Sequence, residues 1–119
     1  MHELSVCLSL LREVERIARE HNAGRVTKIS VTVGPLSGVE PPLLENAFPI
    51  AAAGTVASAA TLHLDFMPVR VTCGECGKES EVPANRLVCE HCGDWRTQLL
   101  SGDELMLERV VLDTAGRGD

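Results

Sequence analysis

Aromatic side chains are almost absent from this chain of 119 residues, which contains two Phe, one Trp and no Tyr. Proteins that bind single-stranded nucleic acids commonly stack the bases on aromatic side chains, so this scarcity argues against such a partner. The net charge of −6 and the lack of a basic cluster argue equally against binding to a phosphate backbone. A core must be built from aliphatic residues, and the hydrophobic fraction of 45% suffices for one compact unit but is small for two.

Long apolar segments are lacking as well. No run of apolar residues is long enough to cross a bilayer, so we expect no membrane partner. The first residues lack the basic and apolar regions of a secretory signal peptide, from which we expect a protein that is not exported and keeps its thiols in the reducing cytoplasm. No Ser/His/Asp set, phosphate-binding loop or carboxylate pair stands out, and the sequence therefore does not predict an enzyme.

Two Cys-x-x-Cys-Gly motifs are the most informative pattern that the chain does contain. A gap of two residues lets one turn of backbone direct two sulfurs toward the same point, and the glycine that follows permits the positive φ that such a knuckle often needs. Two facing knuckles form the tetrahedral sulfur cage that Zn²⁺ prefers in closed structural sites. The sequence therefore predicts a structural zinc site with the ligands Cys73, Cys76, Cys89 and Cys92.

Other interpretations of these cysteines stay open at the level of sequence. A rubredoxin-like iron site uses the same four thiolates, whereas a disulfide framework is disfavoured by the missing signal peptide. A thiol–disulfide enzyme based on Cys73 and Cys76 is disfavoured because zinc-bound thiolates are poor redox dithiols. A zinc-ribbon module that binds nucleic acid or protein is the main alternative function, and the acidic charge argues against its nucleic-acid form.

Hydrophobic periodicity predicts two helices in the remainder of the chain. Apolar residues recur at three- and four-residue steps over 4–20, which indicates an amphipathic helix, and Gly24 is expected to end it in a left-handed conformation. A second helix is predicted at 43–53. The Pro41-Pro42 pair suits its first turn, where a missing N–H costs nothing, and Pro49 is expected to kink or shorten it.

Strands are predicted where apolar and polar residues alternate, at 25–33, 61–66, 95–100 and 104–112. The strand–helix–strand order of the first part favours a crossover whose helix covers one face of a sheet. The side chains expected to face the core are Leu62, Leu64 and Phe66 in the second strand and Leu105, Leu107 and Val111 in the last.

The predicted zinc segment interrupts the strands of the first part. This order predicts a discontinuous first domain at 1–71 plus 97–113 and an inserted zinc-binding domain at 72–96. The polar, Gly-rich stretch at 114–119 is expected to be a flexible tail. A homodimer is left open, because a small sheet with an unpaired edge can pair with a second copy.

The amino terminus carries a weaker metal-binding pattern. The α-amine of Met1 together with the amide and imidazole nitrogens of His2 can chelate one ion, and this donor set suits Cu²⁺ or Ni²⁺. Glu3 can add a carboxylate oxygen. The alternative is a frayed terminus in which Glu3 only complements the positive end of the first helix, and the spacing alone favours that alternative.

Four separated motifs occur in order along the chain. They are Met-His-Glu-Leu-Ser at 1–5, Gly-Pro-Leu-Ser-Gly-Val-Glu-Pro at 34–41, the paired knuckles, and Leu-Ser-Gly-Asp-Glu-Leu at 100–105. Together they closely resemble the HypA/HybF family of hydrogenase maturation factors, which deliver nickel to the large subunit of [NiFe]-hydrogenase. The resemblance extends from residue 1 to about residue 112.

The resemblance implies an α+β fold with two helices on a small three-stranded sheet, a nickel-binding α/β domain that carries the inserted four-cysteine zinc domain. It implies Ni(II) as cargo, with His2 as the central ligand, Met1 and Glu3 beside it, and Glu40 close to the site. It also implies that the four cysteines bind structural Zn(II), and that a HypB-type GTPase and the hydrogenase large subunit are the partners.

Four further residues depart from the family motifs or lie outside them. Cys7 lies on the apolar stripe of the first predicted helix and is expected to be a buried core residue. His91 lies between two of the predicted zinc ligands, and we expect it to be solvated or to donate a hydrogen bond near the site, because four thiolates already complete a tetrahedron. His21 and His63 are expected on the surface.

Overall fold

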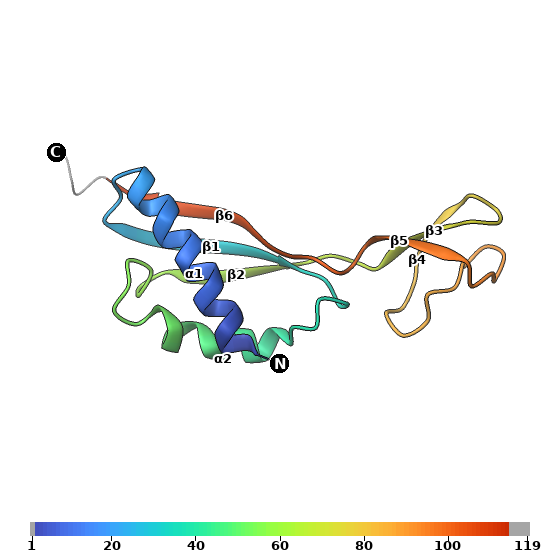
Figure 1. The fold of residues 1–119 in the computed structure, drawn as a ribbon, viewed down its shortest axis with the longest axis horizontal. Helices are drawn as coiled ribbons and strands as arrows, with labels where there is room; N and C mark the ends of the chain where they lie inside the picture. The colour runs from blue at the N-terminus through green and yellow to red at the C-terminus, as the bar shows by residue number, and fades with distance from the viewer. Residues whose placement is uncertain (1, 115–119) are drawn as a thin grey trace.

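The computed structural model describes residues 2–114, so Met1 and all but the first residue of the predicted flexible tail lie outside the described part. The elements in chain order are α1 (Glu3–Glu20), β1 (Arg25–Val33), α2 (Pro41–Ala52), β2 (Thr61–Phe66), β3 (Arg70–Cys73), β4 (Glu79–Glu81), β5 (Thr97–Ser101) and β6 (Leu105–Asp113). They form two three-stranded sheets that follow one another along a molecule of 60 × 27 × 17 Å (Figure 1). The α+β class is confirmed.

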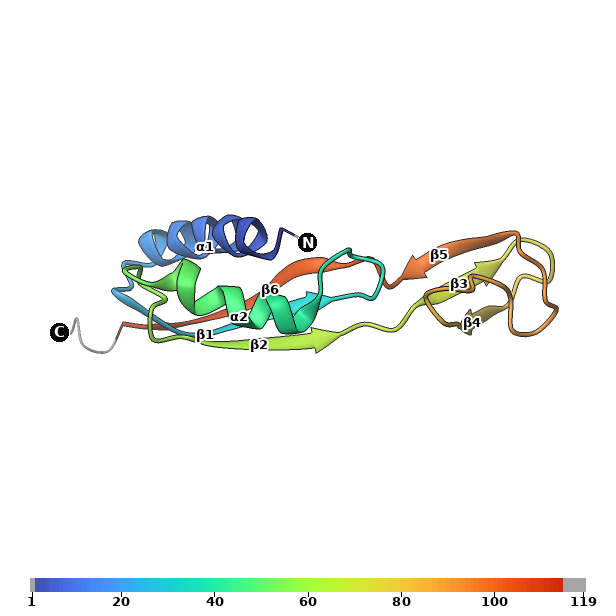
Figure 2. The ribbon, with the colours of Figure 1, turned by 90° about the horizontal axis from the view of Figure 1, so that it is seen from below.

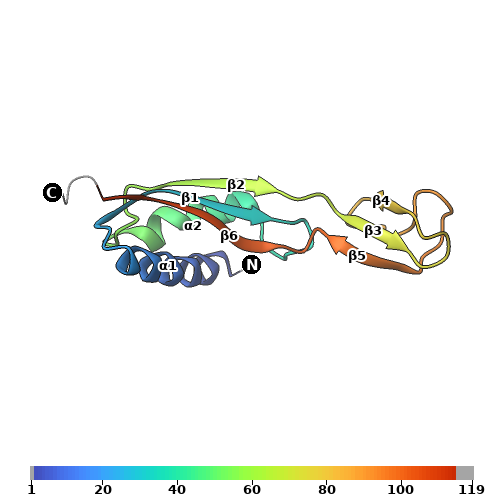
Figure 3. The ribbon, with the colours of Figure 1, turned by 90° about the horizontal axis from the view of Figure 1, so that it is seen from above.

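The first sheet has the strand order β2-β1-β6. β1 and β2 run parallel and are joined through α2, as the predicted crossover requires, while β6 returns antiparallel to β1. Both helices lie on one face of this sheet (Figure 2 and Figure 3), α1 on the β6 side and α2 on the β2 side. None of the helices within residues 2–114 is long and apolar enough to span a membrane.

A single hydrophobic core lies between the helices and the first sheet. The helical residues in it recur at steps of three and four, as expected for an amphipathic face. They are Cys7, Leu11, Val14 and Ala18 in α1 and Leu44, Phe48 and Ala52 in α2. From β1 the core takes Val26, Ile29, Val31 and Val33.

The prediction that Val111 and Phe66 face the core is wrong. Val111 is 38% exposed, while Val110 and Leu112 pack against the core. The cause is a register shift in the β1–β6 pairing, where one extra residue in β6 reverses the alternation of its side chains. Phe66 is 65% exposed, because it pairs with the last residue of β1, Val33, and lines an open groove instead of the core.

The helix ends differ from prediction in two places. Asn22, with a φ of 53°, is the left-handed residue after α1, and Gly24 is not. The N–H of Ala23 reaches the carbonyl of Ala18 at 2.9 Å and closes the end of the helix, since Asn also tolerates this conformation. α2 begins at the Pro41-Pro42 pair as predicted, but it continues through Pro49 to its end at residue 52, so Pro49 does not shorten it.

The second sheet has the order β4-β3-β5, and β3 is antiparallel to both neighbours. Its core is small and consists of Val69, Val71 and Val82, with Leu36 and Leu99 against them. The hydrogen bonds place 97–101 in this sheet beside β3, whereas the proposed division into 1–71 plus 97–113 and 72–96 remains a prediction.

Three backbone segments cross tightly where the two sheets meet. A Cβ on Gly34 would lie 2.1 Å from the carbonyl oxygen of Gly102, so only glycine fits at that position. The N–H of Leu36 donates to the same carbonyl at 2.7 Å, and the Ser101 hydroxyl donates to the carbonyl of Pro68 at 2.8 Å. The loop after β1 is therefore fixed to the second sheet, and Leu36 packs into its core.

Candidate metal centre

The two cysteine knuckles have the same local structure. In each, the first cysteine donates its N–H to the carbonyl five residues ahead at 2.9 Å and accepts at its own carbonyl the N–H of the glycine four residues ahead. These glycine bonds are 3.1 Å long for Gly77 to Cys73 and 2.9 Å for Gly93 to Cys89. Both glycines have a positive φ, 74° and 79° respectively, which confirms the reason for a glycine after each pair.

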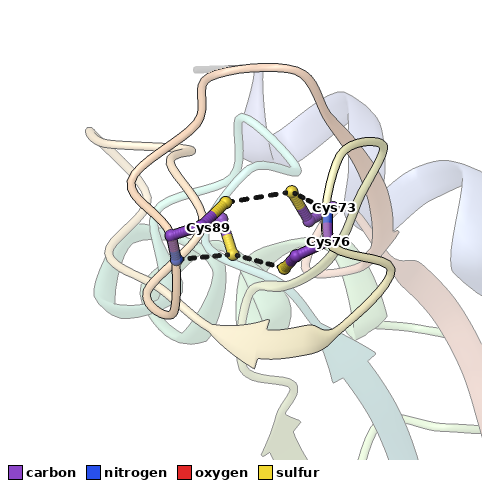
Figure 4. Close-up of side chains that lie close together, drawn as sticks. Cys73, Cys76 and Cys89 are labelled. Atoms are coloured by element: carbon purple, nitrogen blue, oxygen red, sulfur yellow. Dashed lines mark hydrogen bonds between the residues drawn. The ribbon is translucent and has the colours of Figure 1, made fainter.

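The four sulfurs of Cys73, Cys76, Cys89 and Cys92 lie within 4.8 Å of one another (Figure 4). The Sγ atoms of Cys73 and Cys92 are 3.5 Å apart, and those of Cys76 and Cys89 are 3.6 Å apart. Disulfide sulfurs are separated by about 2 Å, so these cysteines are free thiols and the disulfide alternative is wrong. Zinc bonded to four sulfurs at about 2.3 Å requires edges of about 3.8 Å, and the cluster fits such an ion.

Backbone N–H groups point at the sulfurs of the first cysteine in each pair. The N–H groups of Cys76 and Glu75 donate to Cys73 Sγ at 3.4 and 3.3 Å and lower the pKa of that thiol. The N–H of Cys92 donates to Cys89 Sγ at 3.5 Å and is the main cause that lowers the pKa of Cys89 to about 6. These N–H groups therefore stabilise the thiolate form of both sulfurs relative to an ordinary cysteine.

The other two sulfurs favour the protonated form. The N–H of Asp94 lowers the pKa of Cys92, but the neighbouring thiol of Cys73 and burial outweigh it and raise that pKa to about 12. Four negative sulfurs at these distances need a cation between them, and a divalent ion displaces the remaining protons. Cys73 and Cys89 are buried, whereas Cys76 and Cys92 are exposed, so one edge of the cluster faces solvent.

His91 lies beside this cluster and outside it. Its Nε2 is 3.2 Å from the carbonyl oxygen of Glu79 in β4, and its side chain is exposed. Within residues 2–114, the only group of three or more potential ligands that could hold an ion is the four cysteines. The expectation that His91 is not a ligand stays a prediction.

The second candidate metal site is at the amino terminus, where α1 begins. Met1 is outside the described residues. His2 is exposed and precedes α1 in a left-handed conformation, with φ 61° and ψ 28°, and its side chain does not cap the helix. Its carbonyl accepts the first helical hydrogen bond, from the N–H of Val6 at 2.9 Å.

Glu3 connects the beginnings of the two helices. Its side chain is 7% exposed, and its carboxylate accepts the backbone N–H of Glu40 at 3.0 Å across 37 positions of sequence. Glu40 is the residue that precedes α2, and its own side chain is exposed. The structure thus brings Glu3 to the backbone of Glu40 beside His2, a link that no local sequence signal indicates.

The remaining cysteine and histidines lie as predicted. Cys7 is 1% exposed and its Sγ is 3.7 Å from the carbonyl oxygen of Leu44, and burial raises the pKa of its thiol. His21 and His63 are on the surface, and His63 Nε2 lies 2.9 Å from a carboxylate oxygen of Asp65.

Comparison with known proteins is consistent across sequence and structure. The family model described as "Hydrogenase/urease nickel incorporation, metallochaperone, hypA" matches residues 1–112. The chain is 47% identical over 114 residues to the hydrogenase maturation factor HypA of Nitrosospira multiformis, covering 96% of this chain and 99% of that protein. It is 45% identical over 113 residues to HypA of Aquifex aeolicus, covering 95% and 98%.

A solved structure shows the same fold. The solution structure of the Ni metallochaperone HypA from Helicobacter pylori superposes with a TM-score of 0.68 at 26% sequence identity. The match covers 94% of this chain and 97% of that one. The likeness therefore includes both sheets and the segment that joins them.

Proposed function

Because the chain belongs to the HypA family of hydrogenase and urease nickel-incorporation metallochaperones, we propose that it binds Ni(II) at its amino terminus and delivers the ion during maturation of [NiFe]-hydrogenase. The ion is cargo, and the proposed work is transfer without catalysis. The supporting observation is that the exposed His2 directly precedes Glu3, whose carboxylate accepts the backbone N–H of Glu40 where the two helices begin.

The position of His2 suits a chelate that forms without cost to the fold. A residue that precedes a helix does not use its own N–H in the helical hydrogen bonds, so the His2 amide nitrogen can bind an ion while α1 stays intact. The proposed donors are this nitrogen, the His2 imidazole and the Met1 amine, with Glu3 and Glu40 supplying negative charge. This set suits the tetragonal coordination of Ni²⁺.

The same position limits how tightly the ion is held. The amino-terminal end of a helix dipole is positive and opposes a cation, and the carboxylate of Glu3 offsets this only in part. A carrier needs such a balance, because the ion must be kept from solution and still be surrendered to a better set of ligands. A site at an exposed chain end also allows the acceptor to approach the ion directly.

For the four cysteines we propose structural Zn(II). When bound, the ion supplies closed tetrahedral coordination and no open position for catalysis. The hydrophobic core of the second sheet contains only three buried valines, so its folding is expected to depend on this ion. Iron in the same cage would give a coloured protein, and a colourless one with one zinc per chain separates the two.

The proposed partners follow from the family. They are a HypB-type GTPase and the large subunit of [NiFe]-hydrogenase, both in the cytoplasm. The sequence relatives are named hydrogenase maturation factors, which supports an acceptor in that pathway. Docking on either partner would provide the better-placed ligands to which the ion passes.

The test compares His2→Ala with His21→Ala, which removes another exposed histidine. Calorimetric titration with Ni²⁺ is expected to show one strong site in the native chain and in His21→Ala, and none in His2→Ala. Zinc content and the circular dichroism spectrum are expected to be unchanged in all three. Native nickel affinity in His2→Ala would refute the proposal.

A further inference from the structure

A groove at the start of α2 is a surface that the proposed function does not use. It has a volume of 350 Å³ and lies between the first turn of α2, the loop that follows β1 and the end of β2 (Figure 2). Its walls are almost entirely apolar, and they include Val33, Pro35, Val39, Pro41, Pro42 and Phe66. Among the described residues, Glu40 is the only charged one that lines it. A cavity of this size accepts one or two large side chains, so the groove fits a segment of another protein.

Phe66 lines this groove while most of its ring is in contact with solvent. Its side chain is 65% exposed, although it is one of only three aromatic residues in the chain. The next residue, Met67, is 36% exposed, and Pro42 is exposed as well. Exposed apolar side chains gathered at one groove indicate a contact surface, and aromatic anchors contribute much of the binding energy at such surfaces.

The start of α2 does not attract a negatively charged ligand. Helix starts commonly bind anions through free backbone N–H groups, but Pro41 and Pro42 have no N–H. The N–H groups of Leu43 and Leu44 both donate to the carbonyl of Glu40, at 3.0 Å. No residue within 2–114 forms a hydrogen bond or an ion pair with the exposed carboxylate of Glu40. The groove therefore presents an unneutralised negative charge, which fits a cationic side chain.

The charges of the surrounding chain lead to the same conclusion. All eleven Lys and Arg residues lie in 1–28 and 70–119, so the segment 29–69, which includes α2 and β2, contains none. The carboxylates of this segment are those of Glu40, Glu45 and Asp65. A complementary partner therefore carries Lys or Arg next to the apolar residue that enters the groove.

Glu40 also connects the groove to the proposed nickel site. Its backbone N–H donates to the carboxylate of Glu3 at 3.0 Å, and Glu3 directly follows the exposed His2. A protein segment seated in the groove therefore lies close to the chain end at which the ion is proposed to bind. Such a segment brings the ligands of its own protein toward that ion.

We propose that this groove is the docking site of the protein that receives the nickel, and that it binds an extended segment in which a large apolar side chain lies next to Lys or Arg. The identity of the partner as the nickel acceptor rests on the proposed function, whereas the chemistry of the segment rests on the groove alone. The apolar side chain packs against Phe66 and the prolines and supplies most of the affinity. The cation pairs with Glu40 and selects this segment over an acidic one.

The first test uses three capped tripeptides and the zinc-loaded chain without nickel. The probes are Arg-Leu-Arg, Glu-Leu-Glu and Arg-Ser-Arg, acetylated and amidated at their ends. In ¹H–¹⁵N correlation spectra, Arg-Leu-Arg is expected to shift the amide signals of Val33, Val39 and Phe66 and to bind about tenfold more tightly than either of the other peptides. Equal binding of Arg-Ser-Arg would show only a general attraction to an acidic chain and would overturn the proposal. The absence of shifts with all three peptides would overturn it as well.

Phe66→Ser and Ile50→Ser form a matched pair of variants. Each replaces an exposed apolar residue, at 65% and 71% exposure, but only Phe66 lines the groove. Phe66→Ser is expected to weaken the binding of Arg-Leu-Arg about tenfold, whereas Ile50→Ser is expected to bind it as the native chain does. Melting curves are expected to be similar for all three chains, because neither side chain is buried. Native affinity for the peptide in Phe66→Ser would contradict the proposal.

Nickel transfer separates this inference from the proposed function. Calorimetry is expected to give the same nickel affinity for the native chain and both variants, because neither residue is among the proposed donors. Transfer from the loaded chain to the hydrogenase large subunit is expected to slow about tenfold in Phe66→Ser and to be unchanged in Ile50→Ser. Transfer at the native rate in Phe66→Ser would overturn the groove as the docking site and leave the proposed function intact. A native chain that binds Arg-Leu-Arg but no nickel would refute the proposed function and with it the identity of the partner.

Discussion

The two sheets are stabilised in different ways. The first sheet and its helices bury fourteen hydrophobic residues in one core, whereas the second sheet buries three. A core of three valines cannot offset the conformational entropy of the loops that hold the cysteines. We therefore expect the first sheet to fold by burial of apolar surface and the second by binding its ion, which predicts that they can be separated experimentally.

The two candidate metal sites also differ, in how far their donor atoms are fixed before an ion binds. The cysteine cluster is held by two knuckles whose hydrogen bonds and left-handed glycines fix four sulfurs before an ion arrives. The amino-terminal site relies on an exposed histidine in front of a helix. Preorganised donors suit an ion that stays, and a terminal chelate suits one that leaves.

The largest expected effect comes from Cys89→Ala, which removes a buried member of the four-cysteine cluster, a proposed zinc ligand. Zinc content is expected to fall to near zero, and amide signals of β3, β4 and β5 in an ¹H–¹⁵N correlation spectrum are expected to lose dispersion. Signals from α1, α2 and β1 are expected to persist. The matched control is Cys7→Ala, which removes a cysteine from the first core and should keep the zinc.

Cooperative loss of both sheets in Cys89→Ala would break the comparison. It would mean that the first core is not sufficient without the second sheet. If the amide signals of β3, β4 and β5 stayed dispersed in Cys89→Ala without bound metal, the second sheet would not depend on its ion, which would also contradict the comparison.

A smaller effect is expected from Gly34→Ala at the junction between the sheets. The new Cβ would lie 2.1 Å from the carbonyl oxygen of Gly102, so the crossing segments must move apart, at a cost of about 3 kcal/mol in the free energy of unfolding. Gly54→Ala is the control: no atom lies within 4 Å of its Cβ, and its left-handed φ of 78° costs only about 1 kcal/mol. Chemical denaturation of the zinc-loaded chains measures the free energy of unfolding of both variants. Equal losses of stability in Gly34→Ala and Gly54→Ala would show that the junction is not tightly packed.

The smallest expected effect separates two roles of Glu3. Glu3→Gln keeps an oxygen that can accept the N–H of Glu40 but removes the charge, so nickel affinity is expected to fall about tenfold with little change in Tm. Glu3→Ala removes both, and is expected to lower Tm as well. Calorimetry and thermal melting of the pair distinguish these outcomes, and native nickel affinity in Glu3→Gln would leave Glu3 with a structural role only.

Much of the fold could be predicted because its signals are local. The stripe of α1, the strands β1 and β2, and the glycine after each cysteine pair are indicated within a few residues of sequence, and each is present in the structure. The turn of each cysteine pair was predictable for the same reason, since the spacing within the pair determines it.

Features that depend on distant contacts were missed. The extra residue in β6 is visible only against β1, and it exchanges Val111 for Val110 in the core. The bond between Glu3 and the backbone of Glu40 joins residues 37 positions apart. Leu36 reads as a loop residue, yet it packs into the second sheet because Gly34 and Gly102 let two backbones touch.

The most direct test of the two-site account is the metal content of a chain whose amino terminus is extended by two residues, Gly-Ser, ahead of Met1. After exposure to one equivalent each of Zn²⁺ and Ni²⁺ and removal of unbound ions, elemental analysis is expected to find one zinc per chain and almost no nickel, whereas the native chain holds one of each. An extended chain that retains a full equivalent of nickel would contradict the account.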